Sequence, residues 1–342
     1  MGQASSAHMR MAKYTIRRLL QALPVFIGIT VITFFLINAI PGDPARILLG
    51  PGGNAEMVEQ VRARYGLDQP LWKRYLNYLA GVLQGDLGTS IHFRGRPVVA
   101  KILERLPVTM LMMVSAFAFA ISTAIPLGIV AANRRNKPTD HVSRVAALIG
   151  VSTPSFWIGL MLIIVFSFHL DVLPASGLIL PWAAPSAVEG ASTRSDVLLQ
   201  AAQHLIMPTI TLGTLYMAAV MRIERSSMLD VLNQPYIQLA RAYGVGERTI
   251  LRKHAFQNAQ LPIITVLGLQ LTSAFGGAVL TETVFNINGM GRLIITGINN
   301  QDYQLVMGTT LCFGVTFVIG VIITDLLYAY IDPRVSYGEE AV

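Results

Sequence analysis

The chain has 342 residues, of which 53% are hydrophobic and 13% are charged, and its formal net charge is +7 at pH 7. This composition is too apolar for an ordinary soluble domain, and the length suffices for a bundle of several membrane-spanning helices. One cysteine, Cys312, excludes an internal disulfide framework. Because the basic residues are scattered between apolar runs, the positive charge indicates membrane flanks and does not indicate nucleic acid.

Six apolar segments are long enough to cross a bilayer, which requires roughly 20 residues of helix. They are residues 19–40, 106–132, 143–168, 203–221, 262–281 and 305–330. We therefore predict an all-α integral membrane protein with six transmembrane helices. Residues 1–9, MGQASSAHM, resemble an added leader and are set aside. Residues 10–40 are expected to be a retained anchor, because a cleaved signal peptide would be shorter and end at a small-residue site.

A long extracytoplasmic segment, residues 41–98, follows the first span and is expected to contain two helices. The stretch NAEMVEQVRARYG predicts a short helix that ends at Gly66. The stretch DQPLWKRYLNYLAGVLQGD predicts a second helix with Asp68 as its N-cap, since its leucines and tyrosines repeat at helical spacing. This second helix is either a scaffold lying on the membrane surface or a docking platform for an external partner.

The distribution of Arg and Lys predicts the orientation. The N-terminus and residues 132–144 and 222–254 are rich in these residues, whereas 169–202 and 282–304 hold one Arg each. The positive-inside rule then places both termini in the cytoplasm. The segment 41–105 is also basic, but the rule loses force for loops longer than about 60 residues.

Within the third predicted span, the run TPSFW contains Pro154. Membrane helices tolerate an internal proline when neighbouring hydroxyls and helices satisfy the freed carbonyls. Ser155 and Trp157 are candidates to line a translocation path. The alternative is a proline kink with an aromatic ring packed beside it.

The stretch QPYIQLARAYGVGERTILRKHAFQNAQLP, residues 234–262, is charged although it lies between two apolar spans. Each of its Arg and Lys residues would cost about 2.5–3.5 kcal/mol at the bilayer centre, so the stretch must lie in water. Pro235 suits the first turn of a helix, and Gly244 can adopt the left-handed conformation that ends one. A second helix is expected from Glu247 toward Pro262. The result is a helix–glycine–helix elbow, which is either a docking element or a solvated loop that binds lipid headgroups.

Three acidic residues near the last span are candidates for contact with solute. Glu282 and Asp302 flank the external segment 282–304 and are expected either to guide a substrate or to be solvated. Asp325 lies near the inner end of the last span, where an ionisable residue is a functional candidate. The alternative is that Asp325 lies at headgroup level and pairs with Arg334.

The elbow resembles the cytoplasmic coupling loop of the permeases of binding-protein-dependent ABC importers. In the peptide-transporting branch this loop reads Ala-Arg-Ala-x-Gly, followed by His-Ala-x-x-Asn-Ala-x-Leu-Pro. The residues that match are Ala240, Arg241, Ala242, Gly244, His254, Ala255, Asn258, Ala259, Leu261 and Pro262. The Glu and one Ala of the wider family's Glu-Ala-Ala pattern are absent.

Other stretches are similar to the "B" permease of dipeptide, oligopeptide, glutathione and nickel importers, and the resemblance covers nearly the whole chain from about residue 14. These stretches are INAIPGDPARILLG (37–50), YGLDQPLWKRY (65–75), GDLGTSI (85–91), RSSMLDVL (225–232), TETVFNINGMGRL (281–293) and DYQLVMG (302–308). In the fifth stretch the family has Pro before Gly289, where this chain has Asn288. The shape of this external loop, which also contains Gly291, therefore stays open.

The resemblance implies a type I ABC importer permease fold in a bacterial plasma membrane. It implies a permease core over residues 99–331, a cytoplasmic coupling loop over 223–261 and a cytoplasmic tail over 332–342. The implied partners are a second, "C"-type permease, two ABC ATPase subunits, an external binding protein and the lipid bilayer. The chain has no G-x-x-x-x-G-K-[ST] stretch, so ATP and Mg are expected on the ATPase subunits, with no cofactor or metal in this chain.

The contact with the ATPase is expected at six residues of the elbow, and no catalytic residue is expected. The six are Ala240, Arg241, Ala242, Tyr243, Gly244 and Glu247. Arg241 is expected to pair with an acid on the ATPase, and Gly244 to set the bend. The competing functions are a self-sufficient secondary transporter or channel, a nickel-complex permease, and an intramembrane enzyme. The first lacks a visible inverted repeat, and the last lacks an H-E-x-x-H pair.

Overall fold

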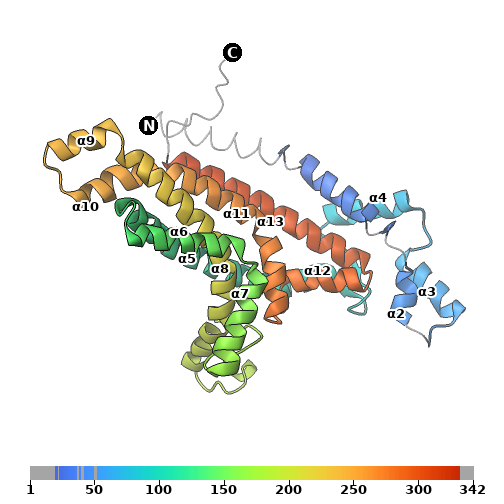
Figure 1. The fold of residues 1–342 in the computed structure, drawn as a ribbon. Helices are drawn as coiled ribbons and strands as arrows, with labels where there is room; N and C mark the ends of the chain where they lie inside the picture. Colours follow the sequence, from blue (N-terminus) through green and yellow to red (C-terminus); the bar gives the residue numbers. More distant parts are fainter. Residues whose placement is uncertain (1–19, 22, 37, 40–41, 50–51, 332–342) are drawn as a thin grey trace, which may run out of the picture. The chain divides into compact units, whose positions relative to one another are not determined.

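The structure is a computed structural model, and it describes residues 20–331 apart from 22, 37, 40–41 and 50–51 (Figure 1). The expected leader, the start of the anchor and the cytoplasmic tail lie outside the described residues. The chain divides into two compact units, residues 1–109 with 288–318 and residues 110–287 with 319–342.

The first unit is helical apart from a small antiparallel hairpin. Its elements are the apolar helix Leu23–Leu36, α2 (Pro44–Leu49), α3 (Ala55–Tyr65), α4 (Leu71–Leu83), β1 (Thr89–Ser90), β2 (Arg96–Pro97), the start of α5 (Val98–Asn133), α12 (Met290–Asn299) and the first part of α13 (Tyr303–Ile331). In the hairpin, Thr89 is opposite Pro97 and Ser90 is opposite Arg96.

The two helices predicted after the first span are both present, but one predicted cap is wrong. The α3 helix begins at an Asn54 cap and ends at Gly66, whose φ of 63° is left-handed as predicted. The N-cap of α4 is Pro70, which makes no side-chain capping bond, and Asp68 lies outside the helix. The reason is that a proline disfavours helical backbone at the residue before it, so α4 cannot begin upstream of Pro70.

The second unit is a bundle centred on α8. Its elements are the rest of α5, α6 (Pro138–Ser152), α7 (Ser155–Leu162), the π-helix η2 (Ile163–His169), the short 3₁₀ helix η3 (Pro185–Ala187), α8 (Arg194–Leu232), α9 (Pro235–Ala242), α10 (Glu247–Thr249), the π-helix η4 (Ile250–Ala255), α11 (Phe256–Val284) and the end of α13. The α8 helix contacts α6, α7 and α11. Its Val220 and Met221 form a buried cluster with Ala124, Ala147 and Ile263.

Four described helices are long and apolar enough to cross a membrane, and a bent helix pair brings the number to five if the pair is one span. The four are α5, α8, the continuous helix Glu247–Val284 and α13, which coincide with the second, fourth, fifth and sixth predicted spans. The predicted first span is represented by the shorter apolar helix Leu23–Leu36, and part of its range lies outside the described residues.

The third predicted span, 143–168, is not one helix. It consists of α6 and α7–η2, which are bent by 103° at a break between them. Thr153 and Pro154 have extended backbone at this break, with ψ of 126° and 132°. Proline has no N–H to donate, so the helical hydrogen-bond ladder stops here. The sequence located the interruption correctly but predicted a kink within one span, and the structure shows a broken pair.

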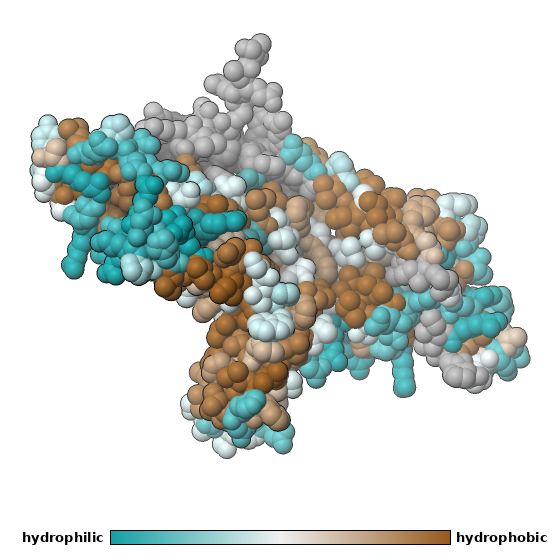
Figure 2. All heavy atoms as spheres, viewed as in Figure 1, coloured by the Kyte–Doolittle hydropathy of each residue, from teal (hydrophilic) through white to brown (hydrophobic). Residues whose placement is uncertain are grey.

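Hydrophilic and hydrophobic surfaces separate within the second unit. Hydrophilic side chains gather over α9, α10 and the turn before α6, whereas α7 and the adjoining part of α8 are mainly hydrophobic (Figure 2). This division is typical of a bundle whose apolar part faces lipid and whose charged end lies in water.

Candidate functional site

The elbow between α9 and α10 is closed by a Schellman motif. Gly244 has φ of 75°, its N–H donates to the Arg241 carbonyl at 2.9 Å, and the Val245 N–H donates to the Ala240 carbonyl at 3.1 Å. A left-handed residue at this position ends a helix at little cost when it is glycine. The predicted role of Gly244 in the local backbone is therefore confirmed.

The helix that follows the elbow is longer than predicted. Gly246 is the N-cap of α10, and Glu247 begins a helix that continues through η4 and α11 to Val284. Pro262 lies inside this helix and does not end it. The elbow is thus attached directly to one of the candidate membrane spans.

Arg241 pairs with Glu247 across the bend. Arg241 Nη2 lies 2.8 Å from Glu247 Oε1, and Nε lies 3.3 Å from Oε2. The hydrogen bond to Glu247 raises the pKa of Arg241. The two side chains are 43% and 47% exposed, so the pair contributes no more than about 1 kcal/mol to stability. Glu247 of the same chain therefore balances the charge of Arg241, and the expected acid on the ATPase is not required for this.

The inner side of the elbow is packed into the bundle. Ile237 of α9 and Ile250 of η4 are fully buried, and they form one cluster with Met228 and Leu232 of α8 and with Ala255. Burying a side chain of this size stabilises by about 1.5–3 kcal/mol. The elbow therefore cannot move freely relative to the end of α8.

The outer side of α9 carries exposed apolar side chains. Tyr236, Leu239 and Tyr243 are 44%, 57% and 81% exposed. Exposed aromatic and aliphatic residues gathered among polar ones mark surfaces that bind other proteins. Of these three, only Tyr243 was predicted to contact the ATPase, although the spacing of the three places them on one side of a helix.

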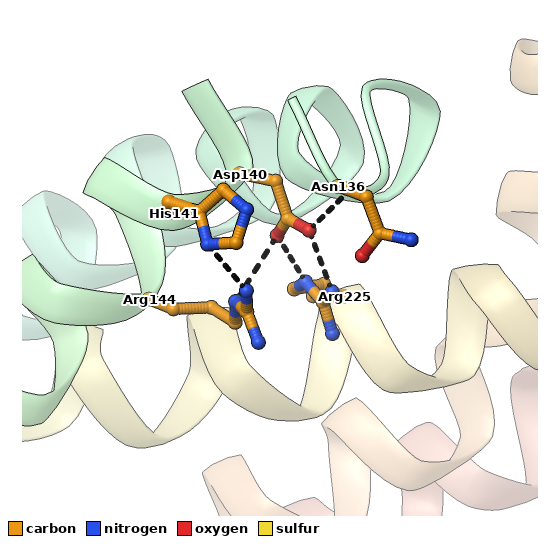
Figure 3. Close-up of polar contacts among 5 residues, drawn as sticks. All are labelled: Asn136, Asp140, His141, Arg144 and Arg225. Atoms are coloured by element: carbon orange, nitrogen blue, oxygen red, sulfur yellow. Dashed lines mark hydrogen bonds and ion pairs between the residues drawn. The ribbon is translucent and has the colours of Figure 1, made fainter. Parts of the chain in front are cut away.

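A buried carboxylate joins the turn before α6 to α8 (Figure 3). Asp140 is fully buried and accepts hydrogen bonds from Arg225 Nε at 2.6 Å, from Arg225 Nη2 at 2.8 Å and from the Asn136 N–H at 2.9 Å. Arg144 Nε lies 3.7 Å away, and its Nη2 lies 2.8 Å from His141 Nδ1. This network was not predicted from the sequence. Its only sequence signal is an acid in the first turn of a helix that begins with proline.

A second buried acid lies on the same segment of α8. Glu224 is fully buried, and Gln260 Nε2 of α11 lies 3.3 Å and 3.2 Å from its two carboxylate oxygens. Gly128 of α5 gives it room, because a Cβ there would lie 2.7 Å from the Cβ and Cγ of Glu224. This contact joins α5, α8 and α11 one helical turn of α8 away from the buried cluster that contains Ile237, Ile250 and Met228.

Glu282 and Asp302, the two acids that flank the external segment, are both fully buried. The alternative that they are solvated is therefore wrong. Asp302 Oδ2 accepts hydrogen bonds from Ser90 Oγ at 2.5 Å and from the His92 N–H at 2.9 Å. Its Oδ1 accepts the Leu305 N–H at 3.2 Å, which caps α13. Asp302 therefore anchors the hairpin to α13.

The loop before α12 is held by α5. The Met290 N–H donates to Thr109 Oγ1 at 2.8 Å, and Arg105 Nη1 donates to the carbonyl of the exposed Asn288 at 3.1 Å. The N-cap of α12 is Gly289. Gly289 and, in the first turn of α12, Gly291 are both buried. Asn288 stands where the family has proline, and its contact with the Arg105 side chain is made by its backbone carbonyl.

The three path candidates are not brought together by any described contact. Ser155 and Asp325 are half-buried, and Trp157 is 49% exposed. Among the described residues, no group of three His, Cys, Asp or Glu side chains is arranged to hold a metal ion.

Two family patterns match the chain. Residues 124–337 match the family described as "Binding-protein-dependent transport system inner membrane component". Residues 11–113 match the family described as "Binding-prot-dependent transport system membrane comp, N-term".

Curated relatives are similar over almost their entire length. The oligopeptide transport system permease protein AppB of Bacillus subtilis (strain 168) is 39% identical over 327 residues, covering 96% of this chain and 100% of the relative. The dipeptide transport system permease protein DppB of Escherichia coli (strain K12) is 38% identical over 338 residues, covering 96% and 99%. The glutathione transport system permease protein GsiC of Escherichia coli O6:H1 is 36% identical over 327 residues, covering 96% and 100%.

Proposed function

Because the chain belongs to the family of binding-protein-dependent transport system inner membrane components, we propose that it is the "B"-type permease subunit of an ABC importer for di- and oligopeptides or glutathione-like peptides. The relatives named above carry these solute classes in their names. The protein is a multi-pass membrane component, and its proposed task is to form the translocation path.

We propose a type I permease fold with six spans and both termini in the cytoplasm. The four long apolar helices, the bent pair α6 and α7–η2, and the helix Leu23–Leu36 together supply six candidates for these spans. The basic segments 132–144 and 222–254 then lie on the cytoplasmic side.

Energy is proposed to come from two separate ATPase subunits, which bind ATP and Mg. A homologous "C"-type permease completes the path, and an external binding protein delivers the solute. The absence of a phosphate-binding G-x-x-x-x-G-K-[ST] stretch from this sequence supports the assignment of ATP hydrolysis to other chains.

The elbow is proposed to couple the ATPase to the bundle, and one observation carries this proposal. Tyr236, Leu239 and Tyr243 form an exposed apolar face, while Ile237 and Ile250 hold the opposite side in the core. A partner that binds the exposed face and moves must therefore move α8 and α11 as well. Closure of an ATPase dimer would be transmitted as rigid-body rotation.

The test is Gly244→Val in the assembled complex. Valine is strongly disfavoured at a φ of 75°, so this substitution changes the bend, and its Cβ would have no neighbouring atom within 4 Å. We expect substrate-stimulated ATP hydrolysis to fall at least about tenfold, as for a loss of coupling worth 1–3 kcal/mol. ATP hydrolysis is measured in nanodiscs with binding protein and dipeptide, and assembly is checked by co-purification.

The matched control is Gly246→Ser. Gly246 is an N-cap with φ of −61°, where serine is favoured, so stimulation should stay near that of the unmodified complex. Normal stimulation in Gly244→Val would remove the coupling role of the elbow. Mass spectrometry of the ligand retained by the binding protein separates a peptide importer from a nickel-complex importer.

A further inference from the structure

The first unit contains a cavity of about 240 Å³ whose lining includes residues of α4 and α13. Arg74, Tyr78, Tyr303 and Gln304 contribute to the lining, together with Phe34 of the apolar helix Leu23–Leu36. We call this cavity the Arg74 pocket. It is small by the standard of ligand sites, which typically have about 300–1,000 Å³, so its ligand must be small or present only one end.

Arg74 is a half-buried cation that forms no ion pair within the described residues, although the Asp86 carboxylate belongs to the same lining. Its guanidinium lies over the rings of Tyr303 and Phe34, 5.4 Å and 6.0 Å from the two centroids. The N–H groups of its guanidinium make no hydrogen bond within the described part of the chain. Burial lowers the pKa of Arg74, which shows that its charge is partly desolvated. The rings fix the plane of the guanidinium and leave its N–H groups to a ligand.

Two further residues of the lining each have a buried polar atom without a partner. The Tyr78 hydroxyl and the Gln304 Oε1 are both buried, and neither makes a hydrogen bond within the described part of the chain. A hydroxyl donates and an amide oxygen accepts. Leaving such atoms unpaired is unfavourable, so a ligand toward which these side chains turn gains affinity by satisfying them.

The donors and the acceptors of the lining define the chemistry of the ligand. The guanidinium and the hydroxyl suit a carboxylate, whereas the amide oxygen and the Asp86 carboxylate, which also belongs to the lining, suit an adjacent N–H. We propose that the Arg74 pocket binds the α-carboxylate and neighbouring N–H of an amino-acid residue, such as the C-terminal residue of a short peptide. Only the choice of a peptide as natural ligand rests on the proposed function.

The experiment measures binding of N-acetylalanine and of N-acetylalaninamide to the assembled complex in phosphatidylcholine nanodiscs, without binding protein, by saturation-transfer NMR. The two probes differ only in the carboxylate. We expect the acid to bind at least about tenfold more tightly, as for the loss of hydrogen bonds to a charged group. Equal binding of acid and amide, or binding of neither, would overturn the proposal.

The variants identify the residues. Arg74→Gln should weaken binding of the acid at least about tenfold, whereas Lys73→Gln removes the same charge from an exposed neighbour outside the lining and should have no effect. Tyr78→Phe should weaken binding, whereas Tyr75→Phe should not, because the Tyr75 hydroxyl already lies 3.1 Å from Thr30 Oγ1. Equal effects within either pair would contradict the assignment.

Two controls distinguish a failure of this proposal from an impaired complex, from a failure of the proposed function and from binding of a partner protein in the pocket. Substrate-stimulated ATP hydrolysis on the same preparations reports whether the complex is intact and whether the proposed function holds, independently of the probe. Displacement of N-acetylalanine by ligand-free binding protein would assign the pocket to an acidic side chain of that partner and overturn the proposal of a small ligand.

Discussion

Asp140 lies beside exposed basic residues, yet it is fully buried and makes two hydrogen bonds to Arg225. The bidentate geometry and the additional Asn136 N–H satisfy most of the acceptor capacity of the carboxylate. A buried pair of this kind contributes little net stability by itself, but removing one partner leaves an uncompensated charge. Asp140 therefore controls the position of the turn between α5 and α6 relative to α8.

Asp140→Asn should destabilise the protein strongly. The variant leaves Arg225 partly buried without its counterion, for which we expect a loss of about 3–5 kcal/mol in the free energy of unfolding. Denaturant unfolding in detergent measures this loss. Arg144→Gln is the control, since Arg144 is 48% exposed and lies 3.7 Å from the same carboxylate. Its loss should stay below about 1 kcal/mol, and similar losses in the two variants would contradict the ranking.

At the residue scale, the sequence predicts local geometry and misses distant partners. The left-handed conformation of Gly244 was predictable because it depends on one helix end and on the residue type. The Asp140–Arg225 pair was not, since its members are 85 residues apart and meet only because α6 packs on α8. The burial of Asp302 was missed for the same reason, since its partner Ser90 lies 212 residues away.

At the element scale, glycines allow close contact between helices at some positions and not at others. A Cβ at Gly128 would lie 2.7 Å from two side-chain carbons of Glu224 and 3.1 Å from the Met221 carbonyl oxygen. A Cβ at Gly276 of α11 would meet no atom within 4 Å. The contact of α5 with α8 therefore depends on Gly128.

Gly128→Ala should weaken the contact between α5 and α8. The added methyl group forces the helices apart or moves Glu224, for which we expect a cost of about 1–3 kcal/mol. Gly276→Ala should be neutral or should stabilise by up to about 1 kcal/mol, because alanine loses less conformational freedom in a helix. Thermal unfolding of both variants measures the difference. A lower midpoint for Gly276→Ala than for Gly128→Ala would refute this account of the packing.

The long helices and the place of the interruption at Pro154 were predictable, but the extent of the interruption was not. The apolar runs behind α5, α8, α11 and α13 exceed what a buried soluble helix requires, so their length alone predicted them. The 103° bend at Pro154 was not predictable, because a proline in a membrane helix is compatible with anything from a slight kink to a break. Both α6 and α7 pack on α8, and these contacts between distant segments cannot be read from the proline alone.

At the scale of the whole molecule, the proposed orientation predicts which side of the membrane each exposed segment faces. Arg248 and Ser186 are both exposed, and they lie in the elbow and in the 170–193 segment respectively. In a Cys312→Ala background, Arg248→Cys should react with a membrane-impermeant maleimide only in inside-out vesicles. Ser186→Cys should react only in right-side-out cells. Reaction of Arg248→Cys in intact cells would reverse the proposed topology.

The length of one helix bears on how the elbow meets its partner. The helix Glu247–Val284 has 38 residues and is therefore about 57 Å long, against a hydrocarbon layer of about 30 Å. If residues 262–281 fill that layer, the preceding 15 residues, 247–261, extend about 22 Å beyond it. This length of helix outside the hydrocarbon layer exceeds the depth of one headgroup layer. A subunit can therefore surround the elbow on several sides without displacing lipid.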